Sequence, residues 1–405
     1  MLVMFKVRNY GPFKEEAVLD MRAVSAYKEH PYNLIGENNG NALLKVVSIY
    51  GANASGKSNF VAAYRYFRKI VSDSFRRNNK DQDESVLEWY YPFFFDNDSL
   101  EADTEFEATY HWEDNEYRYG FIYNSESIKY EWLYKRSLST GRQSRIIERS
   151  PEKIELGPSV KKSCDKYLND IDSDVLVLSF LSSLKLKTHV FEAVAHSILD
   201  VLPMTLTGNE QTANMVKRYF ERDFNEEEKP RLLAFLGGID VGIKDIKVEK
   251  NKDRTTVITY HKGGNGEMYP LGLDVESDGT RRAIAIYSLV RIAALNGRGL
   301  MLDEFNSQLH PLLQKYIIDL FYEANTTGQL IFTTHDTTLL DKQFMRRDQI
   351  WFVSKDERGE SSLYSLADFK VRNDKSFEKD YLSGVYGGIP ILSKFSFGED
   401  DNGNR

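Results

Sequence analysis

The residues best suited to chemistry form one unbroken stretch, 51–58, which reads GANASGKS and fits the pattern G-x-x-x-x-G-K-[ST]. Its two glycines, Gly51 and Gly56, allow the backbone to wrap closely around phosphate groups, and the N–H groups of the loop supply positive potential. Lys57 can then reach the β- and γ-phosphates of a nucleotide, while the Ser58 hydroxyl can ligate Mg²⁺. The stretch therefore predicts a phosphate-binding loop, in preference to a chance match in a glycine-containing turn.

Two adjacent acids, Asp303 and Glu304, follow the apolar residues 300–302. Ligands bind at the carboxyl ends of strands in α/β sheets, so Asp303 is placed to hold Mg²⁺ and Glu304 to orient or deprotonate an attacking water. On their own the two acids fit an ordinary acidic turn, but together with the phosphate-binding loop they favour catalysis. Asp303 lies 246 residues after Lys57, which indicates a large segment inserted between the two motifs.

The elements that must position these residues alternate between strand and helix. Residues 45–50 form a β-branched run that predicts a buried parallel strand leading into the loop. From Ser58 onward the pattern is helical, and the apolar side chains that share one face of this helix are Phe60, Tyr64, Phe67, Val71 and Phe75. Further helices are predicted at 280–295 and 309–324, and further strands at 299–302, 329–333 and 349–353. This alternation predicts parallel βαβ units and an α/β fold.

Three other segments have a different character, although we expect a single domain over residues 1–405. Residues 86–135 are rich in aromatic residues that alternate with polar ones, which predicts an antiparallel β lobe. Residues 165–236 are predominantly helical and predict a helical insertion, a natural place for recognition of a partner or trigger. The polar residues 397–405 predict a flexible tail.

Two runs of charge need an interpretation. The predicted helix after the loop carries a basic stripe that consists of Arg65, Arg68, Lys69 and Arg76. A solvated helix face explains this stripe better than contact with DNA phosphates or with an acidic protein. Similarly, the acidic run 226–228 before Pro230 is typical of a solvated helix boundary.

The composition excludes several classes of protein. With 53 basic and 61 acidic residues the net charge is −8, which argues against a protein that simply coats nucleic acid. The single cysteine, Cys164, can form neither an internal disulfide nor a cysteine metal cluster. The N-terminal residues lack the apolar core of a signal peptide, and no stretch has the roughly 20 apolar residues of a membrane span. We therefore expect a cytoplasmic protein that does not insert into membranes.

The order of motifs along the chain resembles that of ABC-type ATPases. Residues 276–280 (ESDGT) resemble their signature motif, residues 305–311 (FNSQLHP) their D-loop, and residues 332–336 (FTTHD) the segment with the switch histidine. The chain is most similar to the stand-alone SMC-like ATPases of bacterial defence, which are related to the ATPase half of overcoming-lysogenisation-defect nucleases and include AbiL-type, RloA-type and PARIS AriA-type proteins. Residues 5–13 and 381–390 resemble the first and last segments of these proteins.

The resemblance implies an ABC-type (SMC-like) P-loop ATPase head with an antiparallel β lobe and a helical insertion. It implies ATP and Mg²⁺ as cofactors and a head-to-tail homodimer, or a higher oligomer, with ATP held between subunits. Glu304, His335 and Lys57 would be catalytic, and Ser58 and Asp303 would hold the metal. The nucleotide-binding residues implied are Gly51, Asn53, Ala54, Ser55, Gly56, Lys57, Ser58, Asn59, Ser277 and Gly279.

The function implied is a slow ATPase that senses infection and regulates a separately encoded effector, a toxin or nuclease, in anti-phage defence. DNA or a phage protein would be the trigger. One alternative is a DNA-binding ATPase of the SMC or recombination-repair type, and another is a nucleotide-gated scaffold with negligible turnover. We expect no nuclease within the chain, because the 70 residues after His335 are too few for a Toprim domain. No Q-loop can be placed, since Gln82 is the only glutamine between residues 60 and 135.

Overall fold

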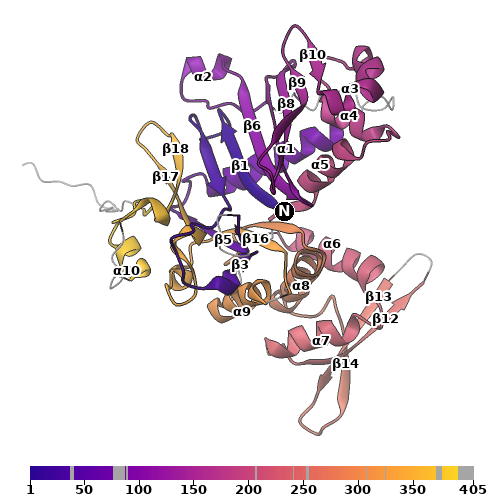
Figure 1. Cartoon of the computed structure of the whole chain (residues 1–405). Coiled ribbons are helices and arrows are strands. Elements are labelled where there is room, and N and C mark those ends of the chain that lie inside the picture. Colours follow the sequence, from indigo (N-terminus) through magenta and orange to yellow (C-terminus); the bar gives the residue numbers. More distant parts are fainter. Residues whose placement is uncertain are drawn as a thin grey trace, which may run out of the picture.

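The computed structural model describes residues 1–36, 41–75, 87, 90–205, 208–239, 241–251, 255–307, 309–323, 325–370 and 376–390. A six-stranded sheet lies at the centre of the molecule (Figure 1). Its strands, in spatial order, are β11 (Val201–Thr205), β15 (Gly299–Asp303), β16 (Gln329–Thr333), β5 (Val46–Gly51), β17 (Ile350–Lys355) and β18 (Ser361–Ser365). All neighbouring strands are parallel except β17 and β18, so the predicted α/β fold with parallel strands is confirmed.

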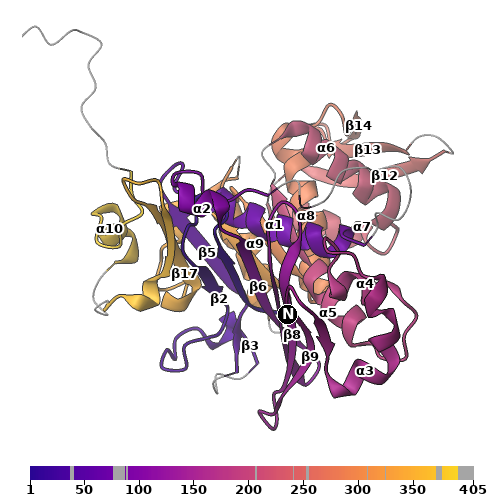
Figure 2. The ribbon, with the colours of Figure 1, turned by 90° about the horizontal axis from the view of Figure 1, so that it is seen from above.

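A seven-stranded antiparallel sheet packs above the central sheet, as Figures 1 and 2 show. We call it the β lobe, and its strands in spatial order are β10 (Ile154–Leu156), β9 (Gln143–Arg149), β8 (Ile128–Ser137), β7 (Asn115–Tyr123), β6 (Thr104–Trp112), β1 (Leu2–Arg8) and β2 (Ala17–Asp20). The predicted lobe, 86–135, is therefore only part of this sheet. The N-terminal strand β1 lies between β6 and the edge strand β2. Its pairing with β6 is long-range, and local patterns could not indicate it.

The described residues also form two smaller sheets and ten α-helices. The small sheets pair β12 (Ile243–Lys250), β13 (Thr255–Lys262) and β14 (Met268–Gly272) in one, and β3 (Leu34–Ile35) and β4 (Leu43–Leu44) in the other. The helices are α1 (Lys57–Asp73), α2 (Asn97–Glu101), α3 (Pro158–Cys164), α4 (Val177–Ser183), α5 (Val190–Leu199), α6 (Asn209–Arg218), α7 (Lys229–Gly238), α8 (Asp278–Asn296), α9 (Pro311–Tyr322) and α10 (Phe377–Leu382). Within the described ranges, no helix has both the length and the apolar character needed to cross a membrane.

The central sheet separates two hydrophobic cores. Alternate side chains of its strands point to opposite faces, as in any pleated strand. Val47 and Ile49 of β5 enter the upper core, which also holds α1 and the inner face of the β lobe, whereas Val46 and Tyr50 enter the lower core with α8 and α9. All six residues of β5 are buried, as expected of a strand covered on both faces.

Helix α1 is held by aromatic packing in the upper core. Phe60, Tyr64 and Phe67 are fully buried, and their rings lie 5.0–5.7 Å from the ring of Phe5 on β1. The predicted apolar stripe on this helix is therefore confirmed, and it binds the helix that follows the phosphate-binding loop to the β lobe.

The predicted helical insertion, 165–236, is divided by a strand. Helix α5 ends at Leu199, and Val201–Thr205 form β11, which pairs in parallel with β15 at the edge of the central sheet. Pro203 disfavours helix in the residue before it and is tolerated in an edge strand. The predicted helical insertion therefore contributes a strand to the central sheet as well as carrying helices.

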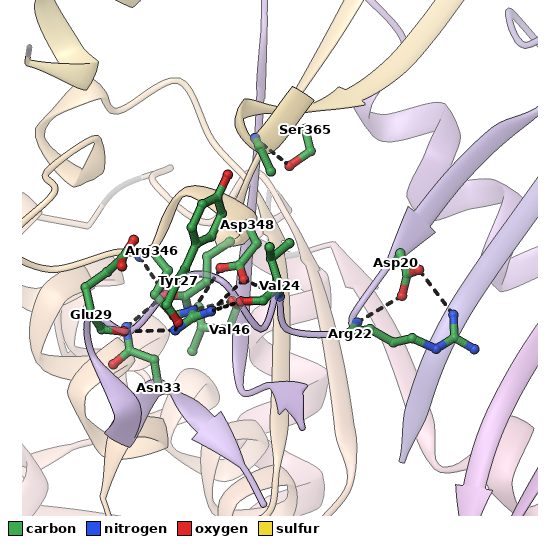
Figure 3. A network of polar contacts seen from close by, with 12 residues as sticks. Asp20, Arg22, Val24, Tyr27, Glu29, Asn33, Val46, Arg346, Asp348 and Ser365 are labelled. Atoms are coloured by element: carbon green, nitrogen blue, oxygen red, sulfur yellow. Dashed lines mark hydrogen bonds and ion pairs between the residues drawn. The ribbon is translucent and has the colours of Figure 1, made fainter. Parts of the chain in front are cut away.

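The 22–30 loop, which precedes β3, is hydrogen-bonded to the arginine of a buried ion pair near the start of β17, as Figure 3 shows. The Arg346 guanidinium donates to both carboxylate oxygens of Asp348 at 2.9 and 2.7 Å, and both side chains are at most 4% exposed. Arg346 also donates to the carbonyl oxygens of Val24, Tyr27 and Glu29. These bonds satisfy three backbone carbonyl oxygens of the 22–30 loop and hold it against the segment that precedes β17.

Candidate active site

The phosphate-binding loop lies between β5 and α1, as the sequence predicts. Gly51 must be glycine, because a Cβ there would lie 2.4 Å from the carbonyl oxygen of Val353 on β17. Gly56 adopts φ +110°, and a Cβ there would lie 2.9 Å from Ser361 Oγ. Asn53 and Ala54 are exposed at the mouth of the loop, where they are accessible to a ligand.

Lys57 is buried at the base of the loop. Its ammonium donates to the carbonyl oxygens of Gly51 and Ala52, at 2.9 Å each. Burial lowers the pKa of Lys57 to about 8, and the negative charges of Asp303 and Glu304 oppose this shift. The cation therefore lies within the loop, close to both predicted acids.

The structure brings Ser58 and Asp303 into contact, although 245 residues separate them. Ser58 Oγ donates to Asp303 Oδ1 at 3.1 Å, and Thr333 Oγ1 donates to the same oxygen at 2.7 Å. A hydroxyl and a carboxylate at the loop mouth form the oxygen-rich donor set that Mg²⁺ prefers. The predicted metal ligands therefore fit a magnesium ion coordinated by Ser58 and Asp303.

Thr333 is a site residue that sequence reasoning missed. Its hydroxyl bridges the two acids, because it donates to Asp303 and accepts the backbone N–H of Glu304 at 2.8 Å. Glu304 adopts φ +52°, an unusual conformation for a residue with a side chain, and this bond helps to hold it. The position of Thr333 at the end of a predicted strand could have indicated its role, because β16 is the parallel neighbour of the strand that ends at Asp303.

His335 follows β16 and lies beside the loop. Asn306 Oδ1 accepts from the backbone N–H of His335 at 3.3 Å and from Thr334 Oγ1 at 3.2 Å, so the segment after the acids positions the histidine segment. Desolvation, and next the Lys57 ammonium, lower the pKa of His335, which favours the neutral ring. The structure thus places Lys57, Asp303 and His335 together.

The predicted signature residues, Ser277 and Gly279, lie at the N-terminal end of α8. Ser277 is the N-cap of α8, since its hydroxyl accepts the backbone N–H of Thr280 at 3.1 Å. Ser277 and Gly279 are exposed, and within the described part of the chain they make no hydrogen bond to the phosphate-binding loop. A Cβ on Gly279 would meet only Ser277 Oγ, at 3.7 Å, so the surface here is open.

Buried acids fix the signature helix from both sides. Glu276 is 7% exposed and binds His261 Nε2 of β13 at 2.7 Å. Glu228, at the start of α7, is 3% exposed and accepts from Arg291 Nε of α8 at 2.6 Å. The interpretation of 226–228 as a solvated boundary was therefore wrong for Glu228, because its carboxylate joins two helices.

The predicted basic stripe is largely occupied by structural contacts. Arg68 donates to the carbonyl oxygen of Leu199 through Nε and Nη2, so a cation lies at the C-terminus of α5. Arg65 Nη2 donates to Thr205 Oγ1 at 2.8 Å. Arg76 lies outside the described residues, as do Gln82, Gln308 and the predicted tail 397–405. Arg65 and Arg68 of the stripe therefore join α1 to its neighbours.

Comparison with protein families gives a match over residues 46–341, to the family described as "AAA domain, putative AbiEii toxin, Type IV TA system". The match spans the phosphate-binding loop, both acids and His335. The chain belongs to this AAA domain family. It therefore carries an AAA-type ATPase domain, and the sheet topology confirms the fold class expected, an α/β P-loop head of the ABC type with an antiparallel β lobe.

Solved structures give further similarities. An SMC head domain from Thermotoga maritima is 11% identical, with a TM-score of 0.40 and coverage of 90% of this chain and 98% of that one. An SmcHead bound to the C-terminal winged-helix domain of ScpA is 14% identical, with a TM-score of 0.42 over 90% and 97% of the two chains. An Smc head domain from Pyrococcus furiosus, bound to the C-terminal domain of ScpA, is 12% identical, with a TM-score of 0.37 over 95% and 99%. No curated protein sequence matches the chain.

Proposed function

We propose that this AAA-family protein binds ATP with Mg²⁺ and hydrolyses it slowly. The observation that carries the proposal is the contact of Ser58 with Asp303 beside the buried Lys57 ammonium. Two oxygen ligands for a metal and one cation for phosphates thus converge at the N-terminus of α1, which itself favours anions. Chance motifs distributed along the chain would not produce this convergence.

The side chains have distinct roles in the proposed reaction. Lys57 exchanges its bonds to the loop carbonyls for bonds to phosphate oxygens, and the bound phosphates then favour its protonated form. Ser58 and Asp303 hold Mg²⁺, which neutralises charge on the phosphates when it is bound. Glu304 orients or deprotonates the attacking water, and the neutral His335 donates a hydrogen bond toward the γ-phosphate.

The exposed signature segment supports a composite site made by two subunits. Ser277 and Gly279 are open to solvent and lie at the start of a 19-residue helix, α8. In a head-to-tail homodimer they would contact the γ-phosphate held by the phosphate-binding loop of the second copy. Dimerisation would then depend on ATP, and larger assemblies would build on the same contact.

We further propose that ATP binding and hydrolysis regulate a separately encoded effector in anti-phage defence. The support is the description of the matched family, which names a putative AbiEii toxin and a Type IV TA system, together with the resemblance of the motifs to stand-alone defence ATPases. The trigger would be DNA or a phage protein, and the effector a toxin or nuclease. The chain itself would supply the nucleotide-dependent switch.

Replacement of Glu304 tests the proposed hydrolysis. Glu304→Gln should lower ATP turnover at least 100-fold, because loss of a general base typically costs 10²–10⁴-fold. ATP affinity should be unchanged, and an ATP-bound dimer should accumulate, measured by light scattering with ATP and with ADP. Glu210→Gln, an exposed glutamate on α6, is the matched control and should behave as wild type. Equal turnover in Glu304→Gln and wild type would contradict the role of Glu304, and undetectable turnover in wild type would favour the nucleotide-gated scaffold.

A further inference from the structure

The outer end of the β lobe carries two hollows on either side of the short helix α3. The first hollow, of about 420 Å³, lies between α3, the hairpin that joins β8 to β9, and the residues that lead into α5. The second, of about 810 Å³, lies between α3, β9 and the 3₁₀ turn Asp165–Asp170. Figures 1 and 2 show α3 at an edge of the molecule, away from α7 and the small sheet β12–β14.

The first hollow combines cations with hydroxyl groups. Lys135 and Arg142 line it together with Ser137, Ser144, Ser159 and Thr188, and no acidic residue lines it. Lysine, arginine, serine and threonine are the side chains that proteins most often use to contact phosphate oxygens of nucleic acids. The lining therefore has the chemistry of a phosphate-binding surface.

The second hollow extends the positive surface along α3. Lys161, Lys162 and Lys166 line it and are exposed, and Asp165 is the only acid in its lining. Arg145 lines it too, but its charge is balanced by Glu148 and Glu155, at 2.6 and 3.0 Å. The three lysines therefore provide the available charge of this hollow.

The lysines and Arg142 form no ion pair within the part of the chain that the structure describes. Among the ion pairs formed by the described residues, none includes Lys135, Arg142, Lys161, Lys162 or Lys166. Five cations that form no ion pair among the described residues thus line the two hollows beside α3, in a chain whose net charge is −8. A local surface of this kind attracts polyanions in spite of the overall charge.

The neighbouring surface indicates which polyanion fits. Protein interfaces depend on exposed aromatic and large apolar side chains as anchors, and single-stranded nucleic acids stack their bases on aromatic rings. The exposed large apolar residues of the described chain include Tyr130 and Met268, but none between residues 135 and 190. Contact through charge and hydroxyl groups alone is typical of binding to the backbone of a duplex.

We propose that the basic face formed by Lys135, Arg142, Lys161, Lys162 and Lys166 binds the phosphate backbone of duplex nucleic acid without sequence preference. The phosphates of one strand lie in the first hollow and those further along the duplex in the second, with α3 between them. This inference goes beyond the proposed ATP hydrolysis and does not depend on it. It also assigns the nucleic-acid contact to α3 and not to the Arg65–Arg68 stripe, whose side chains are engaged within the fold.

The test uses the full chain and a fluorescent 30-base-pair DNA duplex of mixed sequence. Binding is followed by anisotropy between 50 and 200 mM salt, without nucleotide and with ATP. The test variant combines Lys161→Glu, Lys162→Glu and Lys166→Glu. The matched control combines Lys217→Glu, Lys244→Glu and Lys262→Glu, three exposed lysines of α6 and the small sheet, and changes the net charge equally.

We expect the affinity of the test variant for the duplex to be at least tenfold weaker at 100 mM salt. The slope of log K against log salt should fall by about 0.9 for each phosphate that the protein no longer neutralises, thus by about 2–3 in the triple variant. The control should remain within twofold of wild type. A single-stranded oligonucleotide of the same length should bind more weakly than the DNA duplex. A parallel measurement with an RNA duplex determines whether the surface distinguishes duplex DNA from duplex RNA.

Several outcomes would overturn the inference. The first is that the wild-type protein shows no salt-sensitive binding to the duplex. The second is that both triple variants lose affinity for the duplex equally. The third is that poly-glutamate displaces the labelled duplex at a lower concentration of charge than unlabelled duplex does. The last outcome would assign the surface to an acidic protein. ATP turnover, measured in parallel, should be the same in both variants, which shows that the site remains folded. Failure of ATP hydrolysis in wild type would contradict the proposed enzyme but would leave the binding measurement valid.

Discussion

Thr333 offers a sharp test of how the acids are positioned, because one buried hydroxyl contacts both of them. The Thr333 side chain is fully buried, donates to Asp303 Oδ1 at 2.7 Å and accepts the Glu304 N–H at 2.8 Å. Thr333→Val keeps the shape of the side chain and removes only the hydroxyl. The variant loses a hydrogen bond to a charged group, about 1.5–3 kcal/mol, and leaves the Glu304 N–H without its partner, about 1–3 kcal/mol. Because Glu304 is only half-buried, we expect a total loss at the lower end of the combined range, about 2–4 kcal/mol in the free energy of unfolding.

Two measurements separate stability from function. Urea unfolding gives the loss of stability, and the Mg²⁺ concentration for half-maximal ATP turnover reports the position of Asp303. If about 1.4 kcal/mol of positioning free energy is lost, that concentration should rise about tenfold. Thr333→Ser keeps the hydroxyl and removes one methyl group, so it should cost only about 1 kcal/mol and leave the Mg²⁺ requirement near that of wild type.

The reasoning would be refuted by a Thr333→Val protein as stable as wild type, or by a Thr333→Ser protein as impaired as Thr333→Val. The first result would mean that water replaces the hydroxyl at no cost. The second would mean that the methyl group, and not the hydroxyl, matters at this position. Either result would remove Thr333 from the groups that position the acids.

Three further predictions concern buried or partly buried charges. Arg346→Met should lower the free energy of unfolding by about 3–5 kcal/mol because it leaves Asp348 buried and unpaired, and calorimetry that finds a loss below about 1 kcal/mol would contradict this. Glu228→Gln should lower the free energy of unfolding in urea by about 2 kcal/mol. Arg231→Ala should lower it by less than about 1 kcal/mol, because the Arg231 side chain is 62% exposed. A larger loss in Arg231→Ala than in Glu228→Gln would contradict the structural role of the Glu228 carboxylate. The hydrogen bond from His111, and next the contact with Arg22, lower the pKa of Glu116 to about 2, so its contribution to stability is present above pH 4.5 and should be lost as pH falls toward 2. Glu116→Gln should therefore flatten the acid limb of the stability profile, and an unchanged limb would exclude Glu116 as its cause.

Local patterns predicted the part of the site that is contiguous in the sequence. The conformation of residues 51–58 is determined locally, since the glycines, the lysine and the preceding strand are adjacent in the chain. The acids after β15 were also predicted, because a short apolar run that ends in Asp303 and Glu304 is a local signal. Thr333 was missed because its role depends on the parallel register of β15 with β16, which brings two strand ends together.

The fold was less predictable where pairing is remote. Strand β1 joins the β lobe by pairing with β6, about a hundred residues away, and no local pattern indicates that partner. The local pattern of β11 resembles the end of a helix, although this strand completes the edge of the central sheet. The acidic neighbours of Glu228 suggest a solvated residue, whereas tertiary packing against α8 buries it with Arg291. In each case the deciding contact is made by residues distant in the chain.

The two halves of the proposed ATP site are anchored to different parts of the chain. The phosphate-binding loop continues into α1, whose buried face shares one core with Val160 and Cys164 of α3. The signature segment is held instead through Glu276 to β13 and through Glu228 to α7. A ligand on the α3 face is therefore connected by packing to the phosphate-binding loop, whereas a ligand on α7 or the small sheet is connected to the signature. Since binding free energies couple reciprocally, any effect of a duplex on nucleotide affinity must equal the effect of nucleotide on duplex affinity. A change in either affinity therefore indicates that the two sites are coupled, whereas two independent sites leave both affinities unchanged.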